Sequence, residues 1–394
     1  MNTNTIKRYL NIEIPVGQSC FLWGARKIGK STYLHLKFKN AVFVDLLNSE
    51  VFQQYLKNFK QLEEEILGNP DKTIFIIDEI QRIPDLLNEI HRLIEIYKDK
   101  QFILCGSSIR KIRSSGANLL GGRAWRFLML PLCYAELKEL NWKKIFNHGL
   151  IPNHYLSTSN VYKALSSYVF DYVLSEVQYE ASLRKADHFA RFLDILGFCN
   201  GELINYTNIA TDAGVSAKTI KTYFEILFDM YLGYYVNPYV ANPGREIISR
   251  TPKFYLFDVG IANYLKRYEY KSMLGEVTGK AFEHYIFLEL MAYKNYYDKF
   301  CDKREEIYFW RSKEGYEVDF ILANHAFEVK ISTPISIKKH LKGLLEFSST
   351  YQHKFKLHVI SFEPRKRMIK VNDIEITIWP VKEFLEQMWN NNIF

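Results

Sequence analysis

A glycine-rich stretch near the N-terminus has the residue types and the spacing that hold a phosphate group. Gly24, Gly29, Lys30 and Ser31 fit the pattern GxxxxGK(S/T), with an apolar run before it and a helix-forming segment after it. Glycines allow successive backbone N–H groups to surround phosphate oxygens, and the N-terminus of the following helix adds a positive dipole. The pattern predicts a nucleotide-binding loop in which Lys30 reaches the β and γ phosphates of ATP and Ser31 ligates Mg²⁺. Its expected lining residues are Gly24, Ala25, Arg26, Lys27, Ile28, Gly29, Lys30, Ser31 and Thr32.

Two acids stand at the end of a later apolar run. Residues 73–77 (TIFII) lead directly into Asp78 and Glu79, which is the form of a Walker B motif. One carboxylate at the end of such a strand can hold Mg²⁺ and the next can polarise the attacking water, so we assign Asp78 to the metal and Glu79 to the general base. The next apolar run ends near Ser107, which is either a sensor of the γ phosphate or a plain turn serine.

Basic residues gather between positions 110 and 126, and one of them could stabilise the charge that develops during phosphoryl transfer. We select Arg123, which follows two glycines, as the candidate arginine finger. The alternative is a solvated basic loop. The sequence leaves open whether such an arginine acts in its own chain or on a neighbouring subunit.

A second constellation lies near the C-terminus, where two alternating segments flank Asn324 and His325. The pattern predicts a β-hairpin with a two-residue turn, in which Ala323 pairs with Ala326 and Asp319 pairs with Lys330. Because side chains alternate along a strand, one face is expected to be apolar, with Val318, Phe320, Phe327 and Val329. The polar face is expected to gather Asp319, Glu328 and Lys330.

Two acids and a lysine on one face could perform metal-dependent phosphodiester hydrolysis. The carboxylates would hold Mg²⁺ or Mn²⁺ and Lys330 would orient water or stabilise the pentavalent phosphate. Glu283, on the preceding predicted helix, could add a third carboxylate. The alternative is an ordinary hairpin with a cross-strand salt bridge between Asp319 and Lys330.

The elements that must position these residues divide the chain into three regions. Short apolar runs alternate with amphipathic stretches between residues 19 and 131, which predicts a parallel sheet buried between helices. We expect a P-loop α/β domain over 1–153, a mainly helical region over 154–270 and a second α/β domain over 271–394. The fold class is therefore α/β multidomain.

The middle region contains a pattern typical of a helix-turn-helix, with a turn at Gly214 and a helix cap at Ser216. The second helix offers only Lys218 and Lys221 outward, which is few cations for contacts to phosphates. We therefore favour a structural or protein-contacting winged helix over a DNA-reading one.

Composition narrows the class of protein. The chain has 394 residues, of which 48% are hydrophobic and 24% charged, as in globular proteins. The 5 cysteines form no CxxC pair and no disulfide framework, and no apolar run is long enough for a signal peptide or a membrane span. We expect a cytoplasmic protein without a membrane partner. The net charge of +8, concentrated in residues 1–153, permits a polyanionic partner such as DNA or RNA.

The order of the motifs resembles that of prokaryotic AAA-type ATPases with a C-terminal domain of unknown function. The segments that carry the resemblance are GARKIGKST (24–32), DEIQ (78–81), CGSS (105–108), GGR (121–123), PLCYAEL (131–137), PKFYLFDVGIANYL (252–265), GKAFEHYIFLEL (279–290), YFWRSKEGYEVDFILA (308–323) and FEVK (327–330). It covers nearly the whole chain and implies an AAA-like ATPase core, a winged-helix region and a C-terminal domain similar to the PD-(D/E)xK nuclease superfamily. By matching position the ATPase roles fall on Lys30, Ser31, Asp78 and Glu79, and the nuclease-like roles fall on Asp319, Glu328 and Lys330.

Two functions of different classes follow from these patterns. In the first, hydrolysis of Mg-ATP controls a metal-dependent nuclease domain that acts on nucleic acid. In the second, ATP binding sets the conformation of a regulatory switch or scaffold whose nuclease-like domain only holds a partner. The sequence leaves the substrate and the oligomeric state open.

Overall fold

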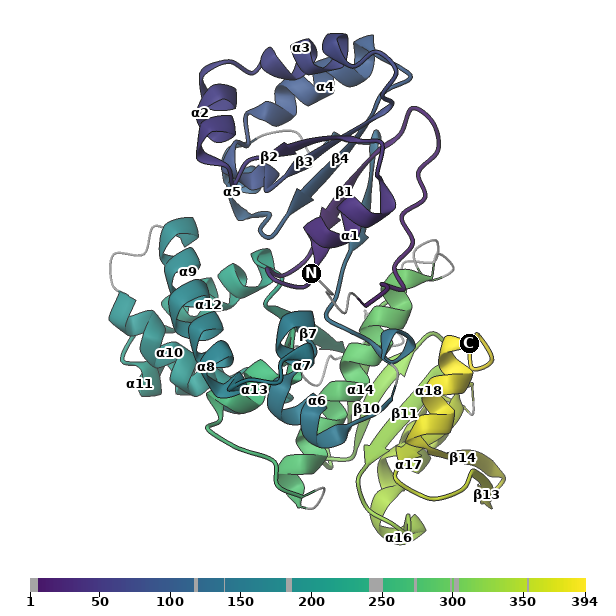
Figure 1. Ribbon diagram of the computed structural model, residues 1–394. Coiled ribbons are helices and arrows are strands. Elements are labelled where there is room, and N and C mark those ends of the chain that lie inside the picture. Colours follow the sequence, from purple (N-terminus) through teal and green to yellow (C-terminus); the bar gives the residue numbers. More distant parts are fainter. Residues whose placement is uncertain are drawn as a thin grey trace.

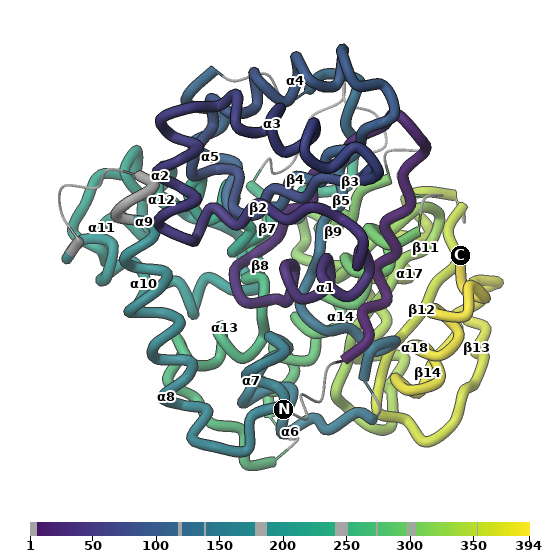
Figure 2. The backbone as a smooth tube through the Cα atoms, turned by 45° about the horizontal axis from the view of Figure 1, so that its top comes forward, coloured from purple at the N-terminus to yellow at the C-terminus, as the bar shows by residue number. Residues whose placement is uncertain are grey.

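The computed structural model describes residues 6–116, 120–137, 139–181, 186–240, 251–272, 275–297, 300, 305–352 and 354–394. Figure 1 shows an N-terminal sheet with its helices above two further regions, a helical one and a C-terminal sheet with its own helices. Figure 2 shows the same arrangement from a second direction, with the helical region and the C-terminal region side by side beneath the N-terminal one. Within the described residues, no helix is both long enough and apolar enough to cross a membrane.

The N-terminal region is built on a five-stranded parallel sheet in the order β2-β3-β4-β1-β5. Its strands are β1 (Ser19–Trp23), β2 (Val42–Asp45), β3 (Ile74–Asp78), β4 (Gln101–Gly106) and β5 (Ala124–Leu128). Each coincides with an apolar run of the sequence, which confirms the predicted parallel sheet. The central strands β1 and β4 are buried along their whole length, as a sheet covered on both faces requires.

Helices cover this sheet and one short 3-10 helix follows β3 directly. Figure 1 shows α2, α3 and α4 together at the top of the molecule and α1 on the side that faces the other regions. The elements are α1 (Lys30–Lys37), α2 (Ser49–Lys57), α3 (Gln61–Gly68), η1 (Ile80–Arg82), α4 (Leu86–Ile96), α5 (Arg110–Ser114) and η2 (Tyr134–Glu136).

The middle region is mainly helical, as its apolar periodicity predicts. Two helices that begin before residue 154, α6 (Trp142–His148) and α7 (Pro152–Leu156), precede it. The helices of the middle region are α8 (Val161–Ser166), the π-helix η3 (Ser167–Val173), α9 (Leu174–Ala181), α10 (Ala186–Cys199), α11 (Tyr206–Ala213), α12 (Ala217–Asp229) and α13 (Val259–Leu265). Gly214, at φ 67°, ends α11 in the left-handed conformation that glycine favours. The Ser216 side chain accepts a hydrogen bond from the backbone N–H of Thr219 and so caps α12. The local helix-turn-helix geometry therefore agrees with the sequence pattern.

A nine-stranded sheet runs through both the middle and the C-terminal regions, in the order β13-β14-β12-β11-β10-β9-β7-β8-β6. The join is parallel pairing of β7 with β9, where Asn237 lies opposite Tyr308. The sheet therefore crosses the expected domain boundary at residue 270. Its strands are β6 (Glu202–Leu203), β7 (Gly233–Pro238), β8 (Lys253–Leu256), β9 (Tyr308–Arg311), β10 (Glu317–Leu322), β11 (His325–Lys330), β12 (Lys356–Ser361), β13 (Arg367–Val371) and β14 (Ile374–Pro380).

The long helix α14 (Glu276–Tyr296) packs on one face of the C-terminal strands. Twelve of its side chains are buried, so it is apolar on more than one side and joins the C-terminal core to residues of the η2 segment. The other helices of this region are α16 (Ile337–His340), α17 (Lys342–Thr350) and α18 (Val381–Trp389).

The hairpin of β10 and β11 differs from its predicted register by two residues. Phe320 pairs with Phe327 and Leu322 with His325, so the turn is at Ala323 and Asn324. Ala323 adopts φ 52°, a left-handed conformation that alanine seldom takes. The sequence therefore favoured a turn one position later, at Asn324 and His325. A shift by two keeps the alternation of faces, and continuing this register places Asp319 opposite Glu328 instead of Lys330.

The predicted apolar face is wrong at Val318. The pairing of β10 with β9 shifts between Val318 and Ile321, which marks a β-bulge or irregularity. Val318 consequently packs with Ile321 in the core beside α17, whereas Phe320 packs with Phe327 in the core beside α14. The irregularity lies between Val318 and Ile321, an interval that contains Asp319.

Candidate functional site

The predicted nucleotide-binding loop (residues 24–32), which we call the phosphate loop, joins β1 to α1 in a conformation that only glycine allows at two positions. Gly24 has φ 148°, and a Cβ there would lie 2.4 Å from the carbonyl oxygen of Met129. Gly29 has φ 95° and immediately precedes α1. The Lys30 ammonium is buried and donates to the carbonyl oxygens of Gly24 and Ala25, at 2.8 and 2.9 Å. The loop thus surrounds its own lysine with neutral acceptors, and phosphate oxygens are stronger acceptors for the same charge.

The two acids predicted to form a Walker B motif, Asp78 and Glu79, lie where β3 ends, next to β4. Glu79 is buried at φ 59°, and Ser107 donates to its Oε2 at 3.1 Å. The Gln81 amide donates to Ser107 Oγ at 3.0 Å and to Glu79 Oε2. Asp78 accepts from the backbone N–H of Glu79 at 3.0 Å and has Cys105 opposite it on β4. Both carboxylates are therefore held by neutral groups, and no lysine or arginine among the described residues forms an ion pair with either of them.

Gln81 is a site residue that the sequence analysis did not select. It stands in the DEIQ segment and holds two of the predicted residues, Glu79 and Ser107, in one network. Its position two residues after Glu79, on a 3-10 helix, carries no signal of that contact in the sequence. The left-handed turn at Glu79 brings it back towards the strand end.

A cavity of about 900 Å³ opens beside this network, a size suited to a nucleotide. The phosphate loop and Glu79 form one wall, and α7 forms another. A third wall is the extended N-terminal segment at residues 6–12, which we call the strap. The predicted site residues that line the cavity are Arg26, Lys27, Ile28, Gly29, Lys30, Ser31, Thr32 and Glu79. Ser31 supplies a hydroxyl and Glu79 supplies carboxylate oxygens to the lining, which is the hard oxygen chemistry that Mg²⁺ prefers. Asp78, at the end of β3, is not among the residues that line this cavity.

Arg123 is not brought to this cavity. Strands β1 and β5 are parallel, with Ser19 opposite Ala124. Arg123 therefore lies at the N-terminal ends of these strands, which we call the edge of the sheet where the strands begin. The phosphate loop follows the other edge, roughly 13 Å away at about 3.3 Å per residue along β1. Arg123 Nε instead pairs with Glu95 Oε1 at 2.5 Å. This placement separates Arg123 from the phosphate loop of its own chain, and an action on a neighbouring subunit stays a prediction.

The predicted C-terminal residues do come together. Lys330 Nζ lies 2.5 Å from Glu328 Oε1 and 3.6 Å from Asp319 Oδ2. The same Asp319 oxygen accepts from the backbone N–H of Val329 at 2.7 Å. Asp319 and Glu328 are each 6% exposed. The lysine ammonium therefore lies between two buried carboxylates.

Glu283 approaches from α14 but is held by other partners. Its Oε1 accepts from the Tyr255 hydroxyl and lies 3.4 Å from Lys253 Nζ. Lys253 also forms an ion pair with Glu317. Lys253 and Glu317 were not selected from the sequence, because Lys253 is on β8 and reaches the hairpin only through the shared sheet. We call Lys253, Glu283, Glu317, Asp319, Glu328 and Lys330 the acid–lysine cluster.

Burial dominates the electrostatics of this cluster. Burial raises the pKa of Glu328, and the neighbouring Asp319 charge raises it further. Burial likewise raises the pKa of Asp319 against the opposing effect of Lys330. Glu328 Oε2 is buried and has no hydrogen-bond partner among the described residues. Across the same described residues, no group of three or more His, Cys, Asp or Glu side chains is arranged to hold a metal ion.

A buried network links the two sites through the strap. Arg8 donates to the carbonyl oxygen of Ile28 in the phosphate loop at 2.5 Å, and its Nε pairs with Glu136 Oε1 at 2.9 Å. Two residues before Glu136, the backbone N–H of Tyr134 donates to Glu289 on α14 at 2.8 Å. The helix that carries Glu289 also carries Glu283 of the acid–lysine cluster. The phosphate loop is therefore connected to that cluster by polar contacts and one helix.

Comparison with known proteins divides the chain into three matched segments. Residues 17–138 match an AAA domain, residues 139–272 match a domain of unknown function (DUF8612), and residues 278–384 match another (DUF4143). Two similar proteins are the uncharacterized proteins Mb2031c of Mycobacterium bovis and Rv2008c of Mycobacterium tuberculosis, each 22% identical over 281 residues. The match covers 69% of this chain and 62% of each relative. The chain thus joins an AAA-type P-loop domain to a C-terminal domain of unknown function.

Proposed function

We propose that the chain binds and hydrolyses Mg-ATP at the phosphate loop, and that this controls a metal-dependent reaction of the acid–lysine cluster on nucleic acid. The observation that carries the ATPase part is the placement of Lys30, Ser31 and Glu79 on one cavity, with Ser107 fixing the Glu79 carboxylate. An AAA-type domain over the same residues supports ATP binding there.

The chain's own groups suffice for the steps that ATP hydrolysis requires. Lys30 would exchange the carbonyl oxygens of Gly24 and Ala25 for the β and γ phosphates. Ser31 and Asp78 would hold Mg²⁺, which neutralises charge that develops on the phosphates. Glu79 would take the proton of the attacking water. Ser107 would keep that carboxylate oriented, since its hydroxyl already donates to Oε2.

For the C-terminal reaction, Asp319 and Glu328 would hold Mg²⁺ or Mn²⁺. Mg²⁺ usually keeps several waters and needs only one or two protein carboxylates, so Glu283 is not required as a third ligand. The metal would polarise a phosphodiester oxygen, and Lys330 would turn from the carboxylates towards the phosphate. The unpartnered Oε2 of Glu328 supports this proposal, because a buried acceptor without a donor is costly unless a cation completes it.

A second candidate is a regulatory switch or scaffold in which the nuclease-like domain is inactive and binds a partner. The position of Lys330 favours it, because the lysine already neutralises Asp319 and Glu328 within the fold. In that case ATP would change the conformation of the chain through the strap, and no bond in a nucleic acid would be cleaved.

The test measures both activities on the full chain. We expect Mg-ATP hydrolysis by the wild type, and its loss in Lys30→Ala but not in Lys98→Ala, an exposed lysine of the same domain. Plasmid DNA, single-stranded DNA and single-stranded RNA are then incubated with Mn²⁺, with and without ATP.

Cleavage that Asp319→Ala abolishes, while ATP hydrolysis persists, supports the enzyme. ATP hydrolysis without cleavage of any of the three substrates supports the scaffold instead. If neither ATP binding nor hydrolysis is detected in the wild type, both candidates are wrong.

A further inference from the structure

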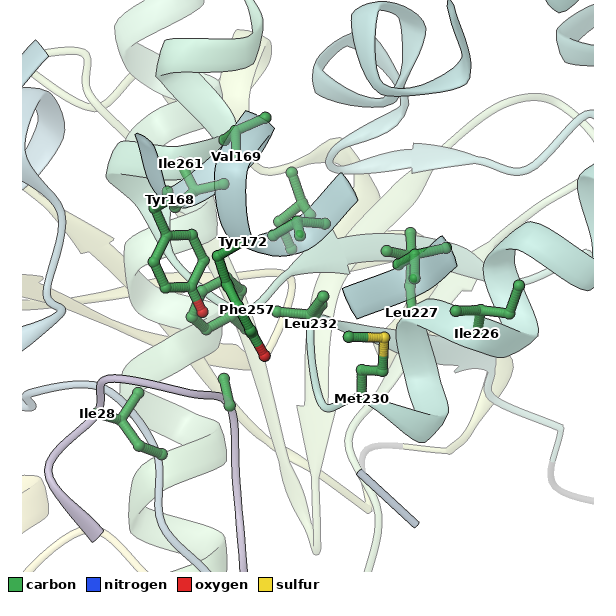
Figure 3. Close-up of a cluster of buried hydrophobic side chains, with 14 of the residues drawn as sticks. Ile28, Tyr168, Val169, Tyr172, Ile226, Leu227, Met230, Leu232, Phe257 and Ile261 are labelled. Atoms are coloured by element: carbon green, nitrogen blue, oxygen red, sulfur yellow. The ribbon is translucent and has the colours of Figure 1, made fainter. Parts of the chain in front are cut away.

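The π-helix η3 and helix α9 lie against the phosphate loop. The Tyr168 hydroxyl donates to the backbone carbonyl oxygen of Arg26 at 3.1 Å. The Arg26 guanidinium lies 5.2 Å from the centre of the Tyr172 ring and forms an ion pair with Glu176 of α9. Figure 3 shows Tyr168 and Tyr172 extending from one helix towards the loop that carries Ile28. Three consecutive turns of the middle region therefore contact one loop residue, and π-helical turns often occur at functional positions.

Arg26 also belongs to the nucleotide cavity. It lines that cavity together with Lys30, Ser31 and Glu79. The charge of its guanidinium interacts with the carboxylates of both Glu176 and Glu79. The side chains of Arg26 and Glu176 are 30% and 25% exposed, so both can move without unpacking a core.

We propose that Arg26 is the arginine that contacts the γ phosphate, and that Glu176 holds it away until ATP binds. This inference rests on the proposed ATP hydrolysis and identifies how the middle region would sense the nucleotide. The arginine first selected from the sequence, Arg123, lies at the opposite edge of the sheet. Arg26 is the arginine of the phosphate loop itself, four residues before Lys30.

The exchange follows from the chemistry of the two partners. A guanidinium presents parallel N–H donors that match two phosphate oxygens, and such charge-assisted pairs are about twice as strong as neutral hydrogen bonds. Glu176 offers one carboxylate in a partly exposed position, where an ion pair contributes little. ADP has no γ phosphate, so with ADP the pair of Arg26 with Glu176 stays closed. With ATP the pair opens and α9 loses its polar contact with the loop.

The test measures the dissociation constants of Mg-ATP and Mg-ADP for the full chain by calorimetry. In the wild type we expect ATP to bind more tightly than ADP. Arg26→Ala should reduce that preference by about 10- to 100-fold, the loss expected for a charge-assisted contact. Arg26→Lys should restore part of it, because the charge remains but the planar fork does not. Arg92→Ala, which removes an exposed ion pair of the same domain, is the matched control and should leave the preference unchanged.

Glu176→Gln tests the latch, the pair of Glu176 with Arg26, separately. Without the carboxylate, the γ phosphate no longer competes with Glu176 for Arg26. ATP should therefore bind a few-fold more tightly, while ADP binding is unchanged. In the Arg26→Ala background the same change should have no effect, since the two residues then share no interaction. Hydrogen exchange of the amides in 167–177 should increase with Mg-ATP in the wild type and not in Arg26→Ala.

The outcomes distinguish a failure of the Arg26 inference from a failure of the proposed ATP hydrolysis. Equal ATP preference in wild type and Arg26→Ala overturns this inference and leaves the ATPase proposal standing. A Glu176→Gln effect that persists in the Arg26→Ala background overturns the latch. A wild type that binds neither nucleotide overturns the ATPase proposal and this inference with it.

Discussion

The phosphate loop and the acid–lysine cluster use the same residue types and arrange them in opposite ways. In the loop, Lys30 contacts neutral carbonyl oxygens, and the carboxylate of Glu79 contacts a hydroxyl and an amide. In the cluster, Lys330 contacts the carboxylates of Asp319 and Glu328 directly. The first arrangement keeps the charges of lysine and acid apart and leaves a cavity beside them, whereas the second neutralises them against each other.

This difference determines what a ligand must do at each site. A nucleotide entering the cavity replaces hydrogen bonds to uncharged groups and brings its own negative charge to an uncompensated lysine. A metal ion entering the acid–lysine cluster must displace a lysine from two buried carboxylates. Burial raises the pKa of Glu328, so below that pKa the ion must also displace a proton. The first site is preorganised for its ligand, and the second has to be opened.

The largest effect is expected from the general base. Glu79→Gln should keep ATP bound but lower kcat for hydrolysis by about 10²- to 10⁴-fold, because it removes the group that takes the water proton. Steady-state hydrolysis together with ATP binding by calorimetry checks both halves of this statement. Glu95→Gln, an exposed glutamate at the other edge of the sheet, should hydrolyse ATP at the wild-type rate. Unchanged kcat in Glu79→Gln would transfer the role of base to another residue.

The next effect concerns stability at the acid–lysine cluster. Lys330→Met should lower the free energy of unfolding by about 3–5 kcal/mol at pH 8, because it leaves two buried carboxylates without their cation. Lys382→Met removes a surface pair and should cost about 0.5 kcal/mol or less. Urea unfolding of the two variants measures the contrast. A small loss in Lys330→Met would show that the cluster is more hydrated than its burial indicates.

The deficit of Lys330→Met should depend on pH with a definite sign. Burial raises the pKa values of Asp319 and Glu328 in the folded chain above those of the unfolded chain. Their protonated forms therefore contribute stability that is present below the unfolded pKa and is lost as pH rises through the folded pKa. The variant should be closest to the wild type in acid and furthest from it in alkali.

Metal binding at the acid–lysine cluster should rise with pH. Below the raised pKa of Glu328, each Mn²⁺ bound must release the proton of that carboxyl, so affinity should increase by up to about 10-fold per pH unit. Calorimetry in two buffers of different ionisation enthalpy counts the released proton. Glu328→Gln should abolish this pH dependence, and a slope that survives in it would assign the proton to another group.

The smallest effect is expected from Gln81→Ala. Gln81 holds Ser107 and Glu79 by one amide, and Ser107 still contacts Glu79 after its loss. One net hydrogen bond of about 1 kcal/mol predicts a decrease in kcat of about fivefold, with ATP affinity unchanged. Gln61→Ala, on the surface of the same domain, is the control. A loss as large as that of Glu79→Gln would make Gln81 a direct participant in the reaction.

The sequence predicts the N-terminal sheet well because local signals determine it. Each buried parallel strand is a short apolar run, and the phosphate loop is a contiguous motif between a strand and a helix. Arg123 does not reach the phosphate loop of its own chain, because it lies just before the start of β5. The two glycines before it give no sign of the end of the strands at which it would lie. Gln81 and Arg8 were missed because their roles depend on contacts between separate elements.

The C-terminal site was predictable only in part. Alternation along two strands brought Asp319, Glu328 and Lys330 together despite the wrong turn, because a shift by two preserves the faces. No sequence pattern predicts the irregularity beside Val318 or the strained turn at Ala323. Lys253 could not be found, because its contact with Glu317 joins strands that are far apart in the sequence.

The nine-stranded sheet has a mechanical consequence for any movement driven by ATP. Strand pairing is continuous from β6 through β7 and β9 to β13. We therefore expect the strands of the middle and C-terminal regions to move together as one sheet. A hinge between β7 and β9 is unfavourable, because it would break the backbone pairing at Asn237 and Tyr308. The five-stranded N-terminal sheet shares no strand with the nine-stranded sheet, so we expect any rotation to occur between the two sheets, where Arg8 of the strap contacts Glu136 and Ile28. A small rotation between the two sheets would then move all nine strands together, and the edge strand β13 would undergo the largest displacement.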